Sequence, residues 1–382
     1  MTPLPLSGVC VVEIGHSLAA PYAGMILAGL GAQVIKIENE AGGDYARDWG
    51  PPFIDGVSAL FHAVNHGKQS VALSFGRAED LRLLRHFVLE KADVVLQNLK
   101  AGNVQRYGID AATLRAVKPS LVYCDLGAFG AAGPLKDKPG YDPLVQAVAG
   151  LMSFLGNPGE PPSRIPVSVN DMGTGLWAAI GVLAALFRRQ ETGEGESVGV
   201  SLYETGLGWG AMQIADYLAS GVLPGRWGSG TAAIVPHQAF ECADGAIMVA
   251  AGNDRLFRRL CEVLGRPDWA EEARFATNSA RVKNRDALFV LLTEVFRTCP
   301  AAEWLAALDR VGVPSGKIQS IDEVVAHEQT AALGMLVRTE DGAARVVGLP
   351  ISFGGRRPDA IGRTPRLGEH NHLLQAVPKV PS

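Results

Sequence analysis

Charge is scarce in this sequence and is nowhere concentrated. Only 19% of the 382 residues are Asp, Glu, Lys or Arg, and the formal net charge is −4. Proteins that follow a nucleic-acid backbone or lie on an anionic membrane carry dense runs of Lys and Arg, and this chain has none. We therefore expect neither nucleic acid nor a membrane among its partners.

Cysteine and long apolar runs are also scarce. The five cysteines lie far apart and never form a CxxC pair, which argues against a disulfide framework and against a zinc site. The longest apolar run, 173–187, is shorter than the roughly 20 residues that span a bilayer, so it predicts a buried helix. The N-terminus has no charged segment ahead of an apolar core, and 9–14 predicts a strand. We expect a cytoplasmic protein.

Several familiar nucleotide-binding and catalytic motifs are absent. No GxGxxG follows the first expected strand, and neither GxxxxGK[ST] nor GxSxG occurs, which disfavours dinucleotide binding, a phosphate loop and a serine hydrolase. The nearest approach to a metal-binding cluster is GEHNH, with Glu369, His370 and His372. We interpret it as a solvated C-terminal segment and expect no metal.

Short β-rich runs alternate with helix-like segments through the first 125 residues, which predicts βαβ units and a parallel sheet. The glycine-rich stretch VLPGRWGSGTAA follows an expected helix at 203–220. Beyond it, a hairpin with its turn at Asp244-Gly245 and several amphipathic helices indicate a second unit. We therefore predict an α/β protein with a large domain over 1–200 completed by about 326–382, a linker helix within 201–224, and a small α+β domain over 225–325.

Asp171 has an unusual setting among the carboxylates. It stands directly before an expected apolar helix, Met172 to Arg189, with Gly173 and Gly175 close behind it. An Asp at the N-cap accepts backbone N–H bonds and complements the helix dipole, which by itself explains the residue. The same donors would keep a partly buried carboxylate ionised at neutral pH, as a nucleophile must be, and the glycines would let an acyl group approach. Spacing alone does not separate these two interpretations.

Several segments together resemble the class III CoA-transferases, the family of formyl-CoA transferase and carnitine CoA-transferase that also contains α-methylacyl-CoA racemase. In chain order they are AAPYAG with GLGAQVIKIE, GGDYARDWGP, NHGKQSVAL, DVVLQNLKAGNVQRYG, GPLKDKPGYD, NDMGTG, RRQETGEGESVGVSLYE, GRPDWAEEARFATNSARVKNRDAL and GVPSGKIQSIDEV. The resemblance reaches from near Gly8 to about Gly368, nearly the whole chain. The resemblance implies a Rossmann-like large domain with a mostly parallel sheet, a smaller α+β domain, and an interlocked homodimer.

The resemblance also implies the chemistry. Asp171 stands at the position of the family's nucleophile, whose carboxylate attacks the donor acyl-CoA to form an aspartyl anhydride and then an aspartyl-CoA thioester. The acceptor carboxylate then attacks this aspartyl thioester, and the CoA thiolate recaptures the new acyl group. Coenzyme A enters as a substrate, so the expected partners are an acyl-CoA donor and a carboxylic acid acceptor.

Other positions correspond to residues with which family members hold CoA. These are Leu18, Ala19, Asn39, Leu73, Ser74, Phe75, Gly76, Asn98, Leu99, Lys100 and Arg106. The two cationic side chains suit phosphate groups. Asn39 replaces an Arg of some members and Leu18 replaces a Gln of formyl-CoA transferase, which speaks against formyl-CoA and oxalate as substrates.

A racemase or epimerase is the first alternative. The racemases carry a GHD-like motif where this sequence has Gly140-Tyr141-Asp142, and a tyrosine with a pKa near 10 is a poor proton shuttle at neutral pH. Tyr141 and Asp142 are therefore expected to line the acyl pocket, unless Asp142 merely caps the helix that follows it. A non-catalytic CoA-thioester-binding protein is the second alternative, which the retained Asp171 and its glycines disfavour.

The acids exchanged are suggested only by two arginines. Arg47 and Arg164 lie in segments from which they could pair with the distal carboxylate of a dicarboxylate such as succinate, mesaconate or citramalate, unless they form surface salt bridges. The loop from Gly228 to Gly230 is expected to shield the anhydride from water.

Overall fold

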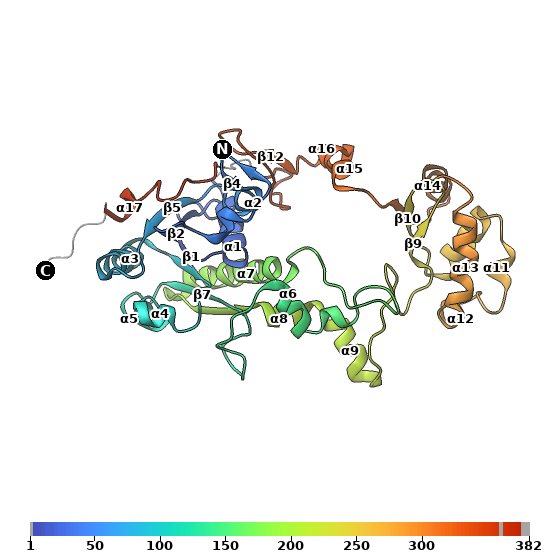
Figure 1. Ribbon diagram of the computed structural model, residues 1–382, viewed down its shortest axis with the longest axis horizontal. Coiled ribbons are helices and arrows are strands. Elements are labelled where there is room, and N and C mark those ends of the chain that lie inside the picture. The colour runs from blue at the N-terminus through green and yellow to red at the C-terminus, as the bar shows by residue number, and fades with distance from the viewer. Residues whose placement is uncertain (1–2, 359–361, 376–382) are drawn as a thin grey trace. The chain divides into compact units, whose positions relative to one another are not determined.

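The computed structural model describes residues 3–358 and 362–375 (Figure 1). The chain divides into two compact units. The first comprises the described residues up to Gly150, Ile165–Ala211, and the described residues from Glu328 on. The second comprises Leu151–Arg164 and Met212–His327.

A parallel sheet forms the centre of the first unit. Its strands are β1 (Cys10–Ile14), β2 (Gln33–Asn39), β5 (Gln69–Leu73), β6 (Val94–Gln97), β7 (Val122–Gly127) and β8 (Ser197–Ser201), in the order β5-β2-β1-β6-β7-β8. All neighbouring pairs are parallel, so the predicted α/β class with a mostly parallel sheet is confirmed. The chain order reverses between β1 and β6, the point at which doubly wound sheets form a crevice at the carboxyl ends of their strands.

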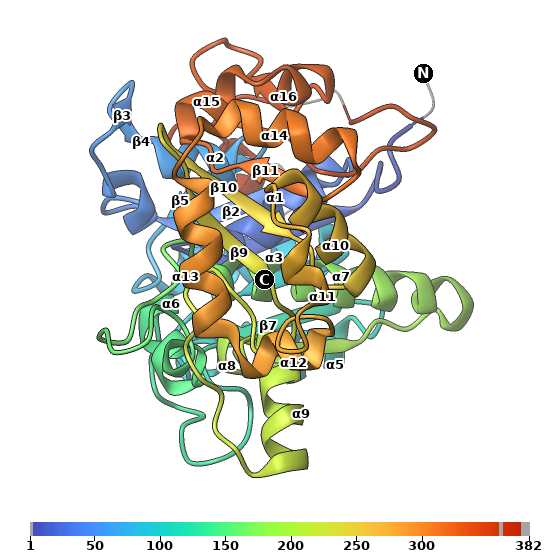
Figure 2. The ribbon, with the colours of Figure 1, turned by 90° about the vertical axis from the view of Figure 1, so that its right-hand side faces the viewer.

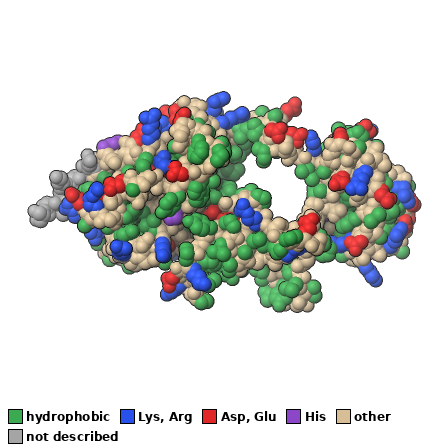
Figure 3. All heavy atoms as spheres, viewed as in Figure 1, with side chains coloured by type: hydrophobic (Ala, Val, Ile, Leu, Met, Phe, Trp, Pro, Cys, Tyr) green, Lys and Arg blue, Asp and Glu red, His purple; other side chains and the backbone are tan. Residues whose placement is uncertain are grey.

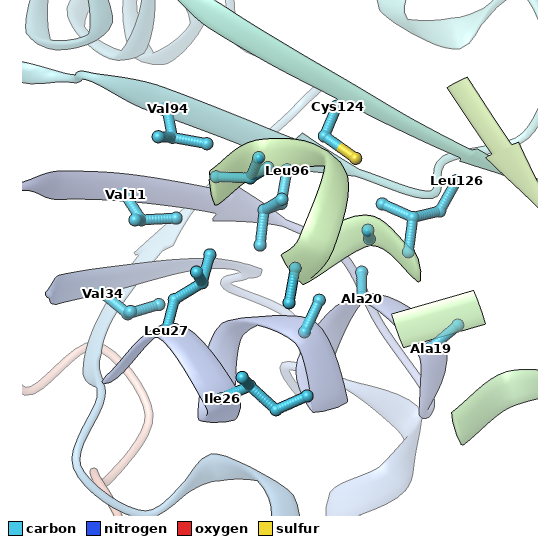
Figure 4. Close-up of a cluster of buried hydrophobic side chains, with 14 of the residues drawn as sticks. Val11, Ala19, Ala20, Ile26, Leu27, Val34, Val94, Leu96, Cys124 and Leu126 are labelled. Atoms are coloured by element: carbon cyan, nitrogen blue, oxygen red, sulfur yellow. The ribbon is translucent and has the colours of Figure 1, made fainter. Parts of the chain in front are cut away.

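Helices cover both faces of this sheet. Because side chains alternate along a strand, Val11 of β1 joins one core with α1 (Ala19–Gly29) and α7 (Val169–Thr192), whereas Val12 joins the other. Figure 4 shows the first of these cores between α1 and the strands. The second core includes residues of α3 (Ala78–Lys91), α4 (Asn103–Tyr107) and α5 (Ala111–Val117).

The remaining elements of this unit surround the sheet. They are η1 (Tyr45–Asp48), β3 (Phe53–Ile54), β4 (Val57–Ser58), α2 (Ala59–Asn65), α6 (Asp142–Val148), α8 (Leu202–Trp209), α16 (Glu328–Ala332), β12 (Leu336–Arg338), β13 (Arg345–Val347) and α17 (His372–Gln375). The single linker helix expected at 203–220 is instead two helices, α8 and α9 (Ala211–Ser220), which are separated at Gly210.

The GEHNH segment is not a freely solvated tail. His370 donates its backbone N–H to Ser70 O (2.8 Å), and the Ser70 N–H donates to His370 Nδ1 (3.2 Å). Ala72 N–H donates to Asn371 Oδ1 (2.8 Å), and Glu369 pairs with Arg363. Since β5 is an edge strand, these bonds satisfy backbone groups that would otherwise be open to another chain.

Helix α7 begins earlier than the sequence predicts. It spans 24 residues and is long and apolar enough to cross a membrane, but it packs against α1 and the sheet as a core helix. Ser168 occupies the N-cap position, so Asp171 is the third residue of the first turn and not the cap. The expectation of an Asp171 N-cap was wrong, because the helix begins at Val169 and so includes both Asn170 and Asp171.

The two glycines behind Asp171 serve helix packing. A Cβ atom at Gly175 would lie 2.8 Å from Ala19 O of α1, and one at Gly173 would lie 2.6 Å from the Trp209 ring of α8. Both approaches are closer than a Cβ tolerates, so neighbouring helices fill the space that we expected an acyl group to use.

The second unit contains a small antiparallel sheet in the order β11-β10-β9, formed by β9 (His237–Glu241), β10 (Ala246–Ala250) and β11 (Ser315–Lys317). The predicted hairpin at Asp244-Gly245 is confirmed. The helices are η2 (Leu151–Ser153), α10 (Asp254–Val263), α11 (Asp268–Glu271), α12 (Asn278–Lys283), α13 (Arg285–Phe296), α14 (Ala301–Arg310) and α15 (Ile321–Ala326). Figure 2 shows β9 and β10 with α10, α13 and α14. Their core contains Phe240, Trp269 and Phe296.

The glycine-rich loop is anchored within the second unit. The Arg285 guanidinium lies 3.9 Å from the centre of the Trp227 ring and donates to the carbonyls of Thr231 and Ala232. On its other side, Arg226 donates to Ser153 O and Glu160 O. These bonds restrain both ends of the loop, and its role as a shield for the anhydride stays a prediction.

We expect Gly175→Ala to destabilise the protein by roughly 1 to 3 kcal/mol, because the new methyl group meets the backbone of α1. Gly208→Ala in α8 is the matched control, since nothing lies within 4 Å of its Cβ position. That change should stabilise by roughly 0.5 to 1 kcal/mol through the higher helix propensity of alanine. Urea denaturation measures both, and equal effects of the two variants would contradict the packing role of Gly175.

Candidate active site

Most of the predicted CoA positions follow four neighbouring strands of the parallel sheet. Leu18 and Ala19 come after β1, Asn39 ends β2, Leu73 ends β5, and 98–100 follows β6. Since these strands are parallel and adjacent, their carboxyl ends meet at one edge. The structure therefore brings these positions to one edge of the sheet, at the point where strand order reverses.

The loops after β1 and β6 are joined by hydrogen bonds at that point. Asn98 accepts a bond from His16 N–H (3.0 Å) with Oδ1 and donates to His16 O (2.9 Å) with Nδ2. The Asn98 side chain thus holds the backbone of the loop after β1, and its contact with CoA stays a prediction. Leu18 and Ala19 are buried, and their contact with CoA stays a prediction.

The cationic positions are more accessible. Lys100 and Arg106 are exposed, and neither forms an ion pair with any residue that the structure describes. Phe75 stacks on Tyr107 with ring centres 5.4 Å apart, and Ser74 N–H donates to Asp80. The segment from Ser74 to Gly76 is thereby fixed beside the helix that carries Arg106.

Helix packing brings Asp171 towards the same edge. Residues four apart lie on one face of a helix, so Asp171 shares the face of α7 that Gly175 turns towards Ala19. Ala19 is the first residue of α1 and directly follows the loop after β1. Asp171 and the predicted CoA positions therefore belong to the same part of the first unit.

Asp142 caps the helix that carries Asp171. Its Oδ2 accepts the N–H of Asn170 (2.7 Å) and that of Asp171 (3.4 Å), and its Oδ1 accepts from Gln146 Nε2 (2.5 Å). Asp142 is only 1% exposed, so it does not line an open acyl pocket as expected. Tyr141, by contrast, is exposed at the surface.

The Asp171 carboxyl is more basic than an ordinary Asp. Burial raises its pKa to about 7, and the charge of Asp142 adds to the effect. The expectation that helix N–H groups would keep this carboxylate fully ionised was wrong, because Asp142 accepts the N–H groups of the first turn. Near neutral pH the group is therefore divided between its protonated and ionised forms.

A network of buried charges supports the loop after β1, and sequence reasoning missed it. Lys36 lies 2.8 Å from Glu13 and 2.9 Å from Asp44, and Lys68 lies 2.7 Å from the other Glu13 oxygen. Asp44 also accepts from Ser17 N–H, which holds Ser17 at a positive φ of 69°. The available signal was the set of charged residues within apolar strands, as in VIKIE.

Arg47 does not face an acyl group. It donates to both oxygens of Glu38 (2.7 and 2.8 Å), and its guanidinium stacks on Phe61 at 4.0 Å. The expectation that Arg47 pairs with a substrate carboxylate was therefore wrong. Arg164 is exposed and forms no ion pair with the residues that the structure describes.

Comparison with known proteins assigns the chain to a family. The family described as CoA-transferase family III matches residues 6–371. The succinate–glutarate CoA-transferase of Agrobacterium fabrum is 37% identical over 97% of this chain and 95% of its own length. The acetyl-CoA:oxalate CoA-transferase of Acetobacter aceti is 34% identical over 97% and 95%.

A solved structure agrees with this match. The crystal structure of a CAIB/BAIF family protein from Brucella suis is 40% identical, covers 98% of this chain and 99% of that one, and superposes with a TM-score of 0.88. The family match, the near-complete coverage of the relatives and the shared fold agree, so the chain belongs to CoA-transferase family III.

Proposed function

We propose that this enzyme moves CoA between carboxylic acids through covalent intermediates on Asp171. The observation that carries the proposal is the setting of the Asp171 carboxylate: it is partly buried, lacks a hydrogen-bond donor among the described residues, and shares one sheet edge with the predicted CoA positions. A basic carboxylate with few hydrogen bonds is a good nucleophile towards a thioester. Family members use CoA thioesters as substrates, which fits that chemistry.

The reaction consists of four acyl transfers. An Asp171 oxygen attacks the donor thioester carbonyl, the C–S bond breaks, and an anhydride and CoA thiolate form. The thiolate attacks the Asp171 carbonyl of the anhydride and releases the donor carboxylate, which leaves CoA on Asp171. The acceptor carboxylate attacks this aspartyl thioester and expels the thiolate, and the thiolate then attacks the acceptor acyl carbonyl of the new anhydride. Asp171 is regenerated, and one thioester has been exchanged for another.

Backbone and side-chain groups of this chain prepare the first step. Closely packed helices fix Asp171 relative to α1, and the Asn98 bonds to His16 fix the loop beneath the predicted CoA positions. Such fixed geometry lowers the entropic cost of bringing thioester and carboxylate together. Exposed Lys100 and Arg106 suit the phosphate groups of CoA.

A racemase is less well supported than transfer. Tyr141 replaces the histidine that a proton shuttle would need, and its side chain is exposed. Loss of α-deuterium from a labelled acyl-CoA, without any acceptor acid, would favour the racemase.

Asp171→Ala should abolish CoA transfer while the protein remains folded, because the nucleophile is lost. Borohydride added during turnover of the native enzyme should reduce the aspartyl thioester, and peptide mass spectrometry should locate the change at Asp171. Asp137→Asn is the matched control, since Asp137 is an exposed carboxylate on the loop before Asp142. Transfer without labelling of Asp171 would contradict the covalent mechanism.

We propose dicarboxylates such as succinate, mesaconate or citramalate as the acids exchanged. Two relatives carry names with succinate, glutarate and oxalate, all dicarboxylates, although Leu18 argues against oxalate here. The sequence predicted that Arg47 or Arg164 binds the distal carboxylate. Because Arg47 is paired with Glu38, we propose Arg164, which is exposed, for this role.

Dicarboxylates should accept CoA at least roughly tenfold faster than monocarboxylates of equal chain length, since one charge-assisted pair is worth about that factor. A panel of acids read by mass spectrometry measures the preference. Arg164→Gln should reduce this preference. Arg255→Gln should not, since Arg255 is another exposed arginine that forms no ion pair with the described part of the chain. Equal rates for both classes of acid would count against this substrate proposal.

We also propose that the enzyme is a homodimer whose two chains are interlocked, as the family resemblance implies. No residue of α9 is buried, and Figure 3 shows apolar side chains gathered there. Met212 and Leu218 are 74% and 78% exposed, and on α7 Phe187 is 70% exposed. Apolar surface of this kind is typical of an interface. A cytoplasmic location stays a prediction.

Sedimentation equilibrium should give twice the 40.3 kDa mass of one chain. Leu218→Glu should shift the equilibrium towards the single chain, because it places a charge in the apolar face. Val117→Glu is the control, since Val117 is similarly exposed on α5. A native mass of one chain at micromolar concentration would rule out the dimer.

A further inference from the structure

We propose that Asp142 is a positioning residue for transfer: by capping α7 it withholds the helix N–H groups from Asp171 and places a second carboxylate beside the nucleophile. This inference rests on the proposed function and deepens it. The Asp142 cap would thereby make Asp171 both a stronger attacking group and a poorer leaving group.

The geometry of the cap supports this role. A carboxylate in the first turn of a helix normally gains from the free N–H groups there. At the start of α7, Asp142 Oδ2 takes the N–H groups of Asn170 and Asp171, while Ser168 at the N-cap makes no side-chain bond. Among the described residues, nothing donates a hydrogen bond to the Asp171 carboxylate.

The Asp142 carboxylate is itself held firmly. Gln146 donates to Asp142 Oδ1 (2.5 Å) and exchanges bonds with both backbone groups of Ile165. This arrangement connects α6 to the chain just before α7. A neutral Ser or Asn would cap a helix equally well. Stability therefore does not explain why the charged side chain of Asp142 is buried beside a second acid, Asp171.

The other titratable groups on elements around α7 do not neutralise Asp171. They are Tyr22 on α1, His16 in the loop after β1, Tyr123, Cys124 and Asp125 on β7, and Tyr203 and Glu204 on α8. Asp125 is hydrogen-bonded to Gln97, and Glu204 to Ser201. None is a Lys or Arg. Burial and the charge of Asp142 raise the pKa of Asp171, and no cation among the residues that the structure describes opposes them.

A basic Asp171 biases both anhydrides towards the aspartyl-CoA thioester. CoA thiolate that attacks the acyl carbonyl re-forms the donor and expels Asp171, whereas attack on the Asp171 carbonyl expels the donor carboxylate. The weaker base leaves more readily, and ordinary carboxylates ionise near pH 4. In the donor anhydride, the pathway that releases the donor acid and leaves CoA on Asp171 is therefore favoured. In the acceptor anhydride, the same rule favours return to the aspartyl-CoA thioester, so this thioester should be the intermediate that accumulates.

The test is the pH profile of kcat/KM for the donor acyl-CoA. In the native enzyme it should rise through pH about 7, as Asp171 ionises. In Asp142→Asn the midpoint should move to lower pH by roughly one unit or more, because the neighbouring charge is gone. Asp142→Glu, which retains the charge, should restore the native midpoint.

The Gln146→Met variant distinguishes the effect of the Asp142 charge from that of the hydrogen bonds that hold Asp142 in place. It removes the bond to Asp142 Oδ1 and leaves the carboxylate in place, so it should lower the Tm without moving the midpoint. An unchanged midpoint in a folded Asp142→Asn variant, or an equal shift in Gln146→Met, would overturn the proposal.

A second measurement does not depend on the folding of Asp142 variants. An acid whose folded pKa is raised costs stability as pH rises from its unfolded value near 4 to about 7. Asp171→Asn should therefore be more stable than the native enzyme at pH 8, and this gain should disappear near pH 4. A gain that is independent of pH would contradict the raised pKa.

The two proposals fail in different ways. If Asp171 is never labelled during turnover, the covalent mechanism itself is wrong. If Asp171 is labelled and only the midpoint stays fixed in Asp142→Asn, the inference about Asp142 alone is wrong.

Discussion

The close packing of α7 on α1 is the constraint on which the candidate active site depends. Gly175 permits the approach because a side chain there would meet Ala19 O at 2.8 Å. Asp171 lies one turn earlier on the same face, so this contact determines where the carboxylate meets the edge of the parallel sheet. The glycines behind the nucleophile thus act through helix packing.

Buried charges have two different uses in the first unit. Lys36, Lys68, Glu13 and Asp44 neutralise one another and hold the loop after β1, which begins the predicted CoA site. Within residues 3–358 and 362–375 no cation compensates Asp171 in this way, and burial together with Asp142 raises its pKa. Burying uncompensated charge lowers stability, and this cost is typical of groups that are kept reactive.

The sequence predicted the elements that depend on local patterns. Alternating β-rich and helical runs predicted the parallel sheet, and the positions expected to hold CoA follow neighbouring strands of it. The start of α7 was predicted wrongly because its cap is supplied by Asp142, 28 residues from Asn170, and no local signal marks such a pair. Arg47 was misassigned for the same reason, since its partner Glu38 lies on another element.

The proposed chemistry requires an Asp171 carboxyl that titrates near neutral pH at the start of α7. NMR of the enzyme labelled with ¹³C at the aspartate carboxyl carbons measures this directly, with the Asp171 signal assigned by its loss in Asp171→Asn. The account predicts a midpoint near pH 7. A midpoint near 4, the value of an ordinary aspartate, would contradict it.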